Sequence, residues 1–145
     1  MAFSIQISID CTDPHAQADW WAATLDWAVE PTDGAFLDRM IAEGHARESD
    51  VIERNGKRVW KDGAAICRSG DVGRSGRERI LFQPVPEPKT TKNRVHLDVN
   101  LGGEDRDGHR ARLEARGARY IEQHSQGPHS WYVMLDPEGN EFCIS

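Results

Sequence analysis

Four segments of the C-terminal third decide the fold: NRVHLDVNL (residues 93–101), GARYIEQ (117–123), SWYVMLDPEGN (130–140) and EFCIS (141–145). Each has the apolar alternation or the flanking turn residues of a β-strand. Between the first two, the run from Glu104 to Arg116 has acidic residues first and arginines later, and Gly117 stands at its end, as is typical of a helix. This part of the chain therefore predicts the order strand, helix, strand, strand, strand.

The strand expected at residues 94–101 has two chemically different faces. The odd-numbered residues 95–101 are Val or Leu, and the even-numbered residues between them are His96, Asp98 and Asn100. Because successive side chains of a strand point to opposite sides, we expect the apolar side to pack and the polar side to carry any chemistry.

The N-terminal segment has the same pattern. Apolar and polar residues alternate from Phe3 to Cys11, and Asp13 with Pro14 has the form of a helix start. The apolar stripe of this helix is expected to be Ala18, Trp21, Ala22 and Leu25. An extended piece follows each predicted helix, at residues 27–30 and 119–122, so the chain reads as an internal duplication.

The first module is expected to carry an insertion at about residues 35–62. AFLDRMIAEG (35–44) predicts a short helix, and Asn55-Gly56 splits residues 51–60 into a hairpin. Such a segment can act as a lid, or it can cap a sheet edge or form a subunit contact. Prolines at 84, 86 and 88 mark an extended crossover, so we expect one domain over residues 1–145 with module 1 at 1–83, the crossover at 84–93 and module 2 at 94–145.

Composition narrows the function classes. Eighteen basic and twenty-four acidic residues give a formal net charge of −6, which argues against nucleic acid as a partner. The absence of a long apolar run or a leader predicts no membrane association and a cytoplasmic location. Three cysteines without metal-type spacing (Cys11, Cys67 and Cys143) are expected to be reduced thiols.

The chain resembles the vicinal oxygen chelate superfamily, in its glyoxalase-like and bleomycin-resistance-like branch. The segments that carry the resemblance are IDCTDPHAQADWWAATLDW (9–27), ILFQPVPEPKTTKNRVHLDVN (80–100) and WYVMLDPEGNEFCIS (131–145). The resemblance covers nearly the whole chain. It implies an α+β fold in which two βαβββ modules form a curled mixed sheet with an open concave cleft, where a small molecule or a metal binds.

The resemblance also implies where a metal would sit. Metal-dependent members place a His or Gln of the first strand, a His of the strand that opens the second module and a Glu of the last strand around one divalent ion. The matching residues here are Gln6, His96 and Cys143. A cysteine thus replaces the carboxylate, and the RILFQPV strand lacks the further carboxylate that glyoxalase I-like enzymes use, so glyoxalase I activity itself is not expected.

This donor set decides between metals. Magnesium and manganese prefer oxygen ligands, whereas a thiolate favours zinc or softer ions. We expect no bound metal; if zinc binds, Gln6, His96 and Cys143 are its ligands, with help from Asp98, Asp10 or Glu141.

The same residues have plainer interpretations. His96 can be a histidine that donates a hydrogen bond to Asp98, Cys143 a small buried residue, and Gln6 a polar wall of the cleft. Trp131 is the best aromatic candidate to stack on a ligand. The expected ligand-binding set is Gln6, Asp10, His96, Asp98, Trp131 and Cys143.

Three functions stay open. The first is a protein that binds a small organic molecule without a metal, which we favour. The second is a metal-dependent, zinc-type lyase, isomerase or dioxygenase. The third is a metal-free enzyme in which His96 and Asp98 act as acid and base. Because family members with two modules commonly pair, we also expect a homodimer.

Overall fold

The structure of the protein is a computed structural model that describes residues 3–145. The chain divides into two compact units, one ending at Pro86 and the other running from Glu87 to Ser145. We call them the first and the second unit and describe each by itself. Met1 and Ala2 lie outside the described residues.

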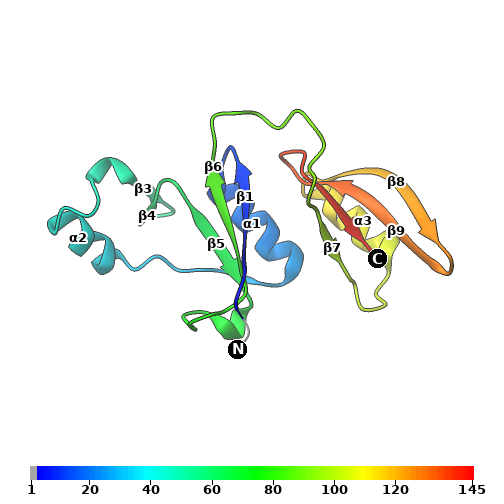
Figure 1. Ribbon diagram of the computed structural model, residues 1–145, viewed down its shortest axis with the longest axis horizontal. Coiled ribbons are helices and arrows are strands. Elements are labelled where there is room, and N and C mark those ends of the chain that lie inside the picture. Colours follow the sequence, from blue (N-terminus) through cyan, green and yellow to red (C-terminus); the bar gives the residue numbers. More distant parts are fainter. Residues whose placement is uncertain (1–2) are drawn as a thin grey trace. The chain divides into compact units, whose positions relative to one another are not determined.

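The first unit contains one four-stranded sheet and the insertion (Figure 1). Its elements are β1 (Gln6–Cys11), α1 (Pro14–Leu25), β2 (Ala28–Val29), α2 (Gly34–Ala42), β3 (Val51–Arg54), β4 (Lys57–Trp60), β5 (Ala64–Cys67) and β6 (Arg79–Pro84), with short 3₁₀ turns at Glu48–Asp50 and Ser69–Asp71. The sheet has the order β1-β6-β5-β2, and β3 pairs with β4 in a separate hairpin.

The second unit repeats the arrangement without an insertion. Its elements are β7 (Leu97–Val99), α3 (Arg106–Ala115), β8 (Arg119–Gln126), β9 (His129–Leu135) and β10 (Glu141–Ile144). Its sheet has the order β7-β10-β9-β8. In both units the first strand pairs in parallel with the last one, and all other pairs are antiparallel. The predicted α+β class with two βαβββ modules is therefore confirmed.

One face of each sheet is covered by a helix. In the first unit α1 packs on β5 and β6, where Trp21 is 1% exposed and Phe82 is fully buried. In the second unit Leu113 of α3 is buried, as are Met134 and Phe142 on the strands. Burial of such a side chain contributes about 1.5–3 kcal/mol relative to an exposed one, so these faces are the cores on which the two sheets depend.

Several local predictions hold in atomic detail. The Asp13 carboxylate accepts hydrogen bonds from the N–H groups of His15 and Ala16 at 3.0 and 2.9 Å and so caps α1. Asn55 and Gly56 both have positive φ angles (50° and 73°), as a two-residue hairpin turn requires. The three cysteines are free and buried.

Other expectations about the strands were wrong. The strand expected at residues 94–101 is only β7, because β10 pairs with it from Leu97 to Val99 and no further. Val95, expected on the packed side, is 77% exposed. Phe3 and Ile5 are likewise exposed, since β1 begins only at Gln6.

The packing face of α3 is narrower than its apolar residues Ala111, Leu113 and Ala115 suggest. Ala111 and Ala115 are exposed rather than packed. The guanidinium carbon of Arg106 instead lies 4.1 Å from the ring centroid of Tyr132, and that of Arg110 lies 4.9 Å from the ring of Tyr120. Cation–π contacts between arginines of α3 and tyrosines of the sheet therefore help to hold this helix on the sheet, where the apolar stripe is narrow.

Among residues 3–145, no helix combines the length and the apolar character that crossing a bilayer requires.

Candidate functional site

The second unit has a cavity of about 630 Å³ on the polar face of its sheet, the side opposite the buried core. We define this polar face by four lining residues: His96, Asp98, Trp131 and Cys143. The volume lies in the usual range for small-molecule sites. All four are residues that the sequence singled out, and the structure brings them together.

Strand register explains why these side chains meet. Cys143 on β10 is the partner of Asp98 on β7 and of Val133 on β9. Trp131 precedes Val133 by two residues on β9, so alternation turns it to the same side. His96 lies just before β7, two residues ahead of Asp98, and lines the same cavity. The opposite side carries the buried Tyr132, Met134 and Phe142.

His96 and Asp98 form a pair on this face. The imidazole Nε2 lies 3.2 Å from the Asp98 Oδ1, with the two side chains 42% and 73% exposed. An exposed pair contributes little to stability. It does orient the ring, because a carboxylate beside one nitrogen selects which nitrogen carries the proton.

The Cys143 thiol is held in its protonated form. Burial, and next the charge and hydrogen-bond acceptance of the Asp98 carboxylate, raise the pKa of Cys143 to about 11, and the nearby Lys92 lowers it only slightly. A thiol with this pKa is a poor nucleophile at neutral pH, and it becomes a metal ligand only by losing its proton.

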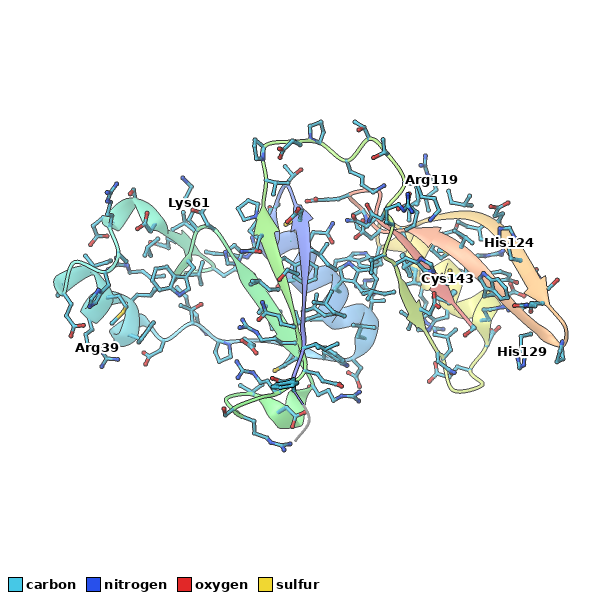
Figure 2. All side chains as sticks on the ribbon, viewed as in Figure 1. Arg39, Lys61, Arg119, His124, His129 and Cys143 are labelled. Carbon is cyan, nitrogen blue, oxygen red and sulfur yellow. The ribbon has the colours of Figure 1, made fainter. Side chains whose placement is uncertain are left out.

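Sequence reasoning missed two histidines beside the site. The ring of His124 on β8 stacks on that of Trp131, with centroids 6.1 Å apart and planes at 27°, and its Nε2 lies 3.0 Å from Glu122 Oε1. His129 lines the cavity. Figure 2 shows His124 on β8, His129 at the β8–β9 turn and Cys143 on β10. Alternation along β8 does not reveal His124, because an irregularity between Tyr120 and Glu122 shifts the register that pairs His124 with Trp131.

Glu141, considered as a helper ligand, is already engaged. Its carboxylate accepts hydrogen bonds from the Lys89 ammonium at 3.1 Å and from the Asn93 N–H at 3.0 Å. Burial alone would raise the pKa of Glu141, but these partners outweigh it and hold the pKa below its usual value. Glu141 therefore anchors the chain that leads into β7.

Gln6 and Asp10 lie on β1 of the first unit, where both are exposed. The Gln6 amide donates a hydrogen bond of 3.3 Å to the Ser8 hydroxyl. Their membership of a ligand site stays a prediction.

A sequence profile of the glyoxalase-like domain family matches residues 6–145. This chain belongs to that family. No curated protein matches its sequence significantly.

Solved structures share the glyoxalase-like fold at low sequence identity. One is a glyoxalase/bleomycin resistance protein/dioxygenase family enzyme from Burkholderia phytofirmans PsJN, with a TM-score of 0.59 and 17% identity over 99% of this chain and 97% of that chain. Another is a bleomycin-binding protein from Streptomyces verticillus complexed with copper(II)-bleomycin, with a TM-score of 0.52 and 13% identity over 100% and 96%.

A third is a mutant of the fosfomycin resistance protein FosX from Listeria monocytogenes, complexed with Mn(II) and a dihydroxypropylphosphonic acid, with a TM-score of 0.60 and 10% identity over 99% of this chain and 90% of that chain. At such identities the likeness shows the fold alone.

Within the glyoxalase-like fold, the two units can be matched strand by strand. The last pair of the parallel ladder is Cys11–Pro84 in the first unit and Val99–Ile144 in the second, and we align the two units on these pairs. The match makes Asp10 equivalent to Asp98 and Gln83 to Cys143. It makes Ser8, rather than Gln6, the equivalent of His96.

This match tests whether a hard metal ion suits the chain. The second unit offers His96, Asp98 and Cys143, and their equivalents in the first unit are Ser8, Asp10 and Gln83. Each set holds one carboxylate, whereas magnesium and manganese prefer several carboxylate and water oxygens, so neither set by itself suits such an ion.

A zinc-type ion fits the second unit better. One ligand atom from each of His96, Asp98 and Cys143 lies within 4.8 Å of the others. Imidazole, carboxylate and thiolate are the ligands that zinc accepts.

Proposed function

We propose that this glyoxalase-like protein binds a small organic molecule in the cavity of the second unit and does so without a magnesium or manganese ion. The observation that carries the proposal is the half-buried Trp131, which lines a cavity of about 630 Å³ together with the His96–Asp98 pair. A flat apolar wall beside a few convergent polar groups is the usual composition of a small-molecule site.

Each part of the cavity has a role in this proposal. Trp131 offers a large ring surface, which contributes both apolar burial and stacking. His96 and Asp98 offer one nitrogen and one carboxylate that hydrogen-bond to polar atoms of the ligand. Cys143 remains protonated and acts as part of the wall.

Two related structures support a binding role for the fold. The Streptomyces verticillus protein is named for its binding of bleomycin, and the Listeria monocytogenes protein is complexed with a phosphonic acid. Their ligands differ in size and charge, so the likeness supports a small organic ligand without specifying which one.

A thermal-shift screen on chelator-treated protein tests the proposal. A ligand that binds the folded protein stabilises it by RT ln(1 + L/Kd), where L is the ligand concentration, so the unfolding temperature rises with the logarithm of the ligand concentration above the dissociation constant. We expect hits with wild type that disappear in Trp131→Ala and persist in Trp27→Phe, a tryptophan substitution in the first unit. Hits that are equally strong in Trp131→Ala would contradict the assignment of the site.

The second candidate function is a zinc-type lyase, isomerase or dioxygenase. The cluster of His96, Asp98 and Cys143 favours it. These residues would hold the ion, which as a Lewis acid polarises a carbonyl or enediolate oxygen. Elemental analysis of protein purified without chelator or nickel distinguishes the candidates: about one zinc per chain, lost in His96→Ala, supports the zinc enzyme, and no zinc in wild type excludes it.

We also propose that the protein is a homodimer, as the family resemblance led us to expect. Light scattering during size-exclusion chromatography at micromolar concentration tests this, and the mass of a single 16.3 kDa chain would contradict it.

A further inference from the structure

The first unit has a cavity of its own, in a region that the proposed function does not use. It measures about 970 Å³ and is lined by residues of α1, the insertion, β5 and β6. The volume is at the upper end of the range for small-molecule sites. Its walls include the segment that distinguishes this chain from a plain pair of βαβββ modules.

The wall formed by the insertion is fastened to α1. The Nε2 of His15, a residue 8% exposed, lies 2.8 Å from the backbone carbonyl oxygen of Trp60. On the same hairpin, Arg54 donates a hydrogen bond of 2.6 Å to the Asp19 carboxylate. The hairpin β3–β4 is thereby held beside the helix, and Trp60 is fixed through its own backbone.

Apolar side chains form much of the lining. Trp60 and Val59 of β4 are half-buried, as is Leu81 of β6, while Phe36 of α2 is 39% exposed and Val29 is 38% exposed. Large apolar groups that line a hollow without filling it leave surface that an apolar ligand group can cover. The Trp60 ring also offers a face of negative quadrupole potential, whereas the guanidinium carbon of Arg39 already lies 5.5 Å from the ring centroid of Phe36.

The charges of the lining are unbalanced. Five carboxylates face three basic side chains around the cavity. Two of the carboxylates are neutralised, since Asp19 pairs with Arg54 at 2.6 Å and Glu30 with Arg79 at 3.1 Å. The remaining three carboxylates face a single basic side chain, Lys57.

These three carboxylates are Asp33, Asp50 and Asp62. Asp33 and Asp50 accept hydrogen bonds from the backbone N–H groups of Ala35 and Arg47, which leaves their negative charge in place. Among residues 3–145, Asp62 has neither a hydrogen-bond nor an ion-pair partner. The cavity therefore combines aromatic walls with an excess of negative charge.

We propose that this cavity is a second ligand site and that it binds an organic ammonium ion carrying an aromatic or aliphatic group. An ammonium group gains from both features, because ring faces attract cations and carboxylates attract them at longer range. The carbon part of the ligand covers Trp60, Phe36 and Leu81. An anionic ligand of the same shape meets the opposite potential and is disfavoured.

Three aromatic probes of similar size and different charge test this inference: benzylammonium, benzyl alcohol and benzoate. The readout is the indole N–H signal of Trp60 in proton–nitrogen correlation spectra, assigned with Trp60→Phe. We expect benzylammonium to shift this signal saturably, benzyl alcohol to do so more weakly and benzoate not to do so. Equal or stronger binding of benzoate, or the absence of a saturable shift with benzylammonium, would overturn the proposal.

Single-charge variants of exposed residues sharpen the test without threatening the fold. Asp62→Asn should weaken benzylammonium binding about threefold and Lys57→Gln should strengthen it about threefold, as expected for one exposed charge nearby. Glu53→Gln, on the same hairpin but outside the lining, is the matched control and should change nothing.

Trp131→Ala separates this inference from the proposed function, because it alters the cavity of the second unit only. Benzylammonium should still shift the Trp60 signal in this variant. Loss of the shift in Trp131→Ala would assign the binding to the other cavity and contradict the second site.

Discussion

The Nε2 atom of His96 lies 3.2 Å from the Oδ1 of Asp98, and Asp98 is in register with Cys143 on the neighbouring strand. One carboxylate therefore influences both an imidazole and a thiol. Its negative charge favours the protonated form of the thiol, because it destabilises the thiolate. Asp98 is for this reason the residue whose substitution reports most on the electrostatics of the site.

The reactivity of Cys143 should depend on Asp98. In metal-free wild type, alkylation of Cys143 should be slow at neutral pH and rise with an apparent pKa of about 11. Asp98→Asn removes the negative charge, so the pKa should fall and alkylation at a given pH should become faster. Mass spectrometry of the peptide that contains Cys143 gives the rate.

Cys67 provides an internal control for this experiment. It belongs to the first unit, where burial and the nearby Glu30 raise its pKa. Its rate of alkylation should be the same in wild type and Asp98→Asn. An unchanged rate for Cys143 would show that Asp98 does not set the potential at the thiol.

Trp131 should supply much of the affinity for a ligand of the second cavity. Loss of its ring removes apolar burial and stacking worth about 1.4 kcal/mol or more. Trp131→Ala should therefore raise the dissociation constant of a hit from the thermal-shift screen about tenfold or more, as measured by calorimetry. Trp60→Leu, in the first unit, should leave that constant unchanged, and an equal loss in both variants would argue against a specific site.

Glu30 should make the first unit sensitive to acid. Burial raises its pKa, but the hydrogen bond from Arg77 and the charges of Arg79 and Arg77 outweigh burial, so the pKa in the folded state is lowered. A lowered pKa means that the stabilisation is present above the pKa of the unfolded chain and is lost as pH falls through the folded value.

Glu30→Gln should thus lower the free energy of unfolding at neutral pH by about 1–3 kcal/mol. It should also remove the share of the decrease in unfolding free energy at low pH that comes from Glu30. Urea denaturation at a series of pH values measures both. If the variant is as stable as wild type at neutral pH and loses stability at low pH to the same extent, the ion pairs of Glu30 with the two arginines add no net stability.

The core of the first unit should depend on Trp21. This side chain is 1% exposed against β5 and β6. Trp21→Ala should cost about 3–5 kcal/mol through lost burial and the cavity left behind. Val72→Ala, at a position 40% exposed, should change stability by less than about 0.5 kcal/mol. Equal effects in urea denaturation would contradict the assigned core.

Strong periodicity made most of the fold predictable. The helices at Pro14–Leu25, Gly34–Ala42 and Arg106–Ala115 and the hairpin at Asn55-Gly56 lie within a few residues of their expected positions. β5 was not anticipated, because Ala64–Cys67 is short and has no alternation. The extent of β7 was overestimated because it depends on how far β10 pairs with it, a long-range fact that local pattern does not contain.

The site was predictable in part for the same reason. Alternation alone places His96 and Asp98 on one face, and their pairing distance agrees with that expectation. Gln6 was matched by residue type to the first-strand metal ligand of the family, whereas the ladder register makes Ser8 the position equivalent to His96. His124 was overlooked since its neighbour Trp131 lies on another strand, and only the β8–β9 register brings the two rings together.

The most direct test of the central claim is a calorimetric titration of chelator-treated protein with the best hit of the thermal-shift screen, in wild type and in Trp131→Ala. We expect metal-free wild type to bind the compound and the variant to bind it about tenfold or more weakly. Binding that appears only after zinc is restored, or that is the same in Trp131→Ala, would contradict a metal-free ligand site in the second unit.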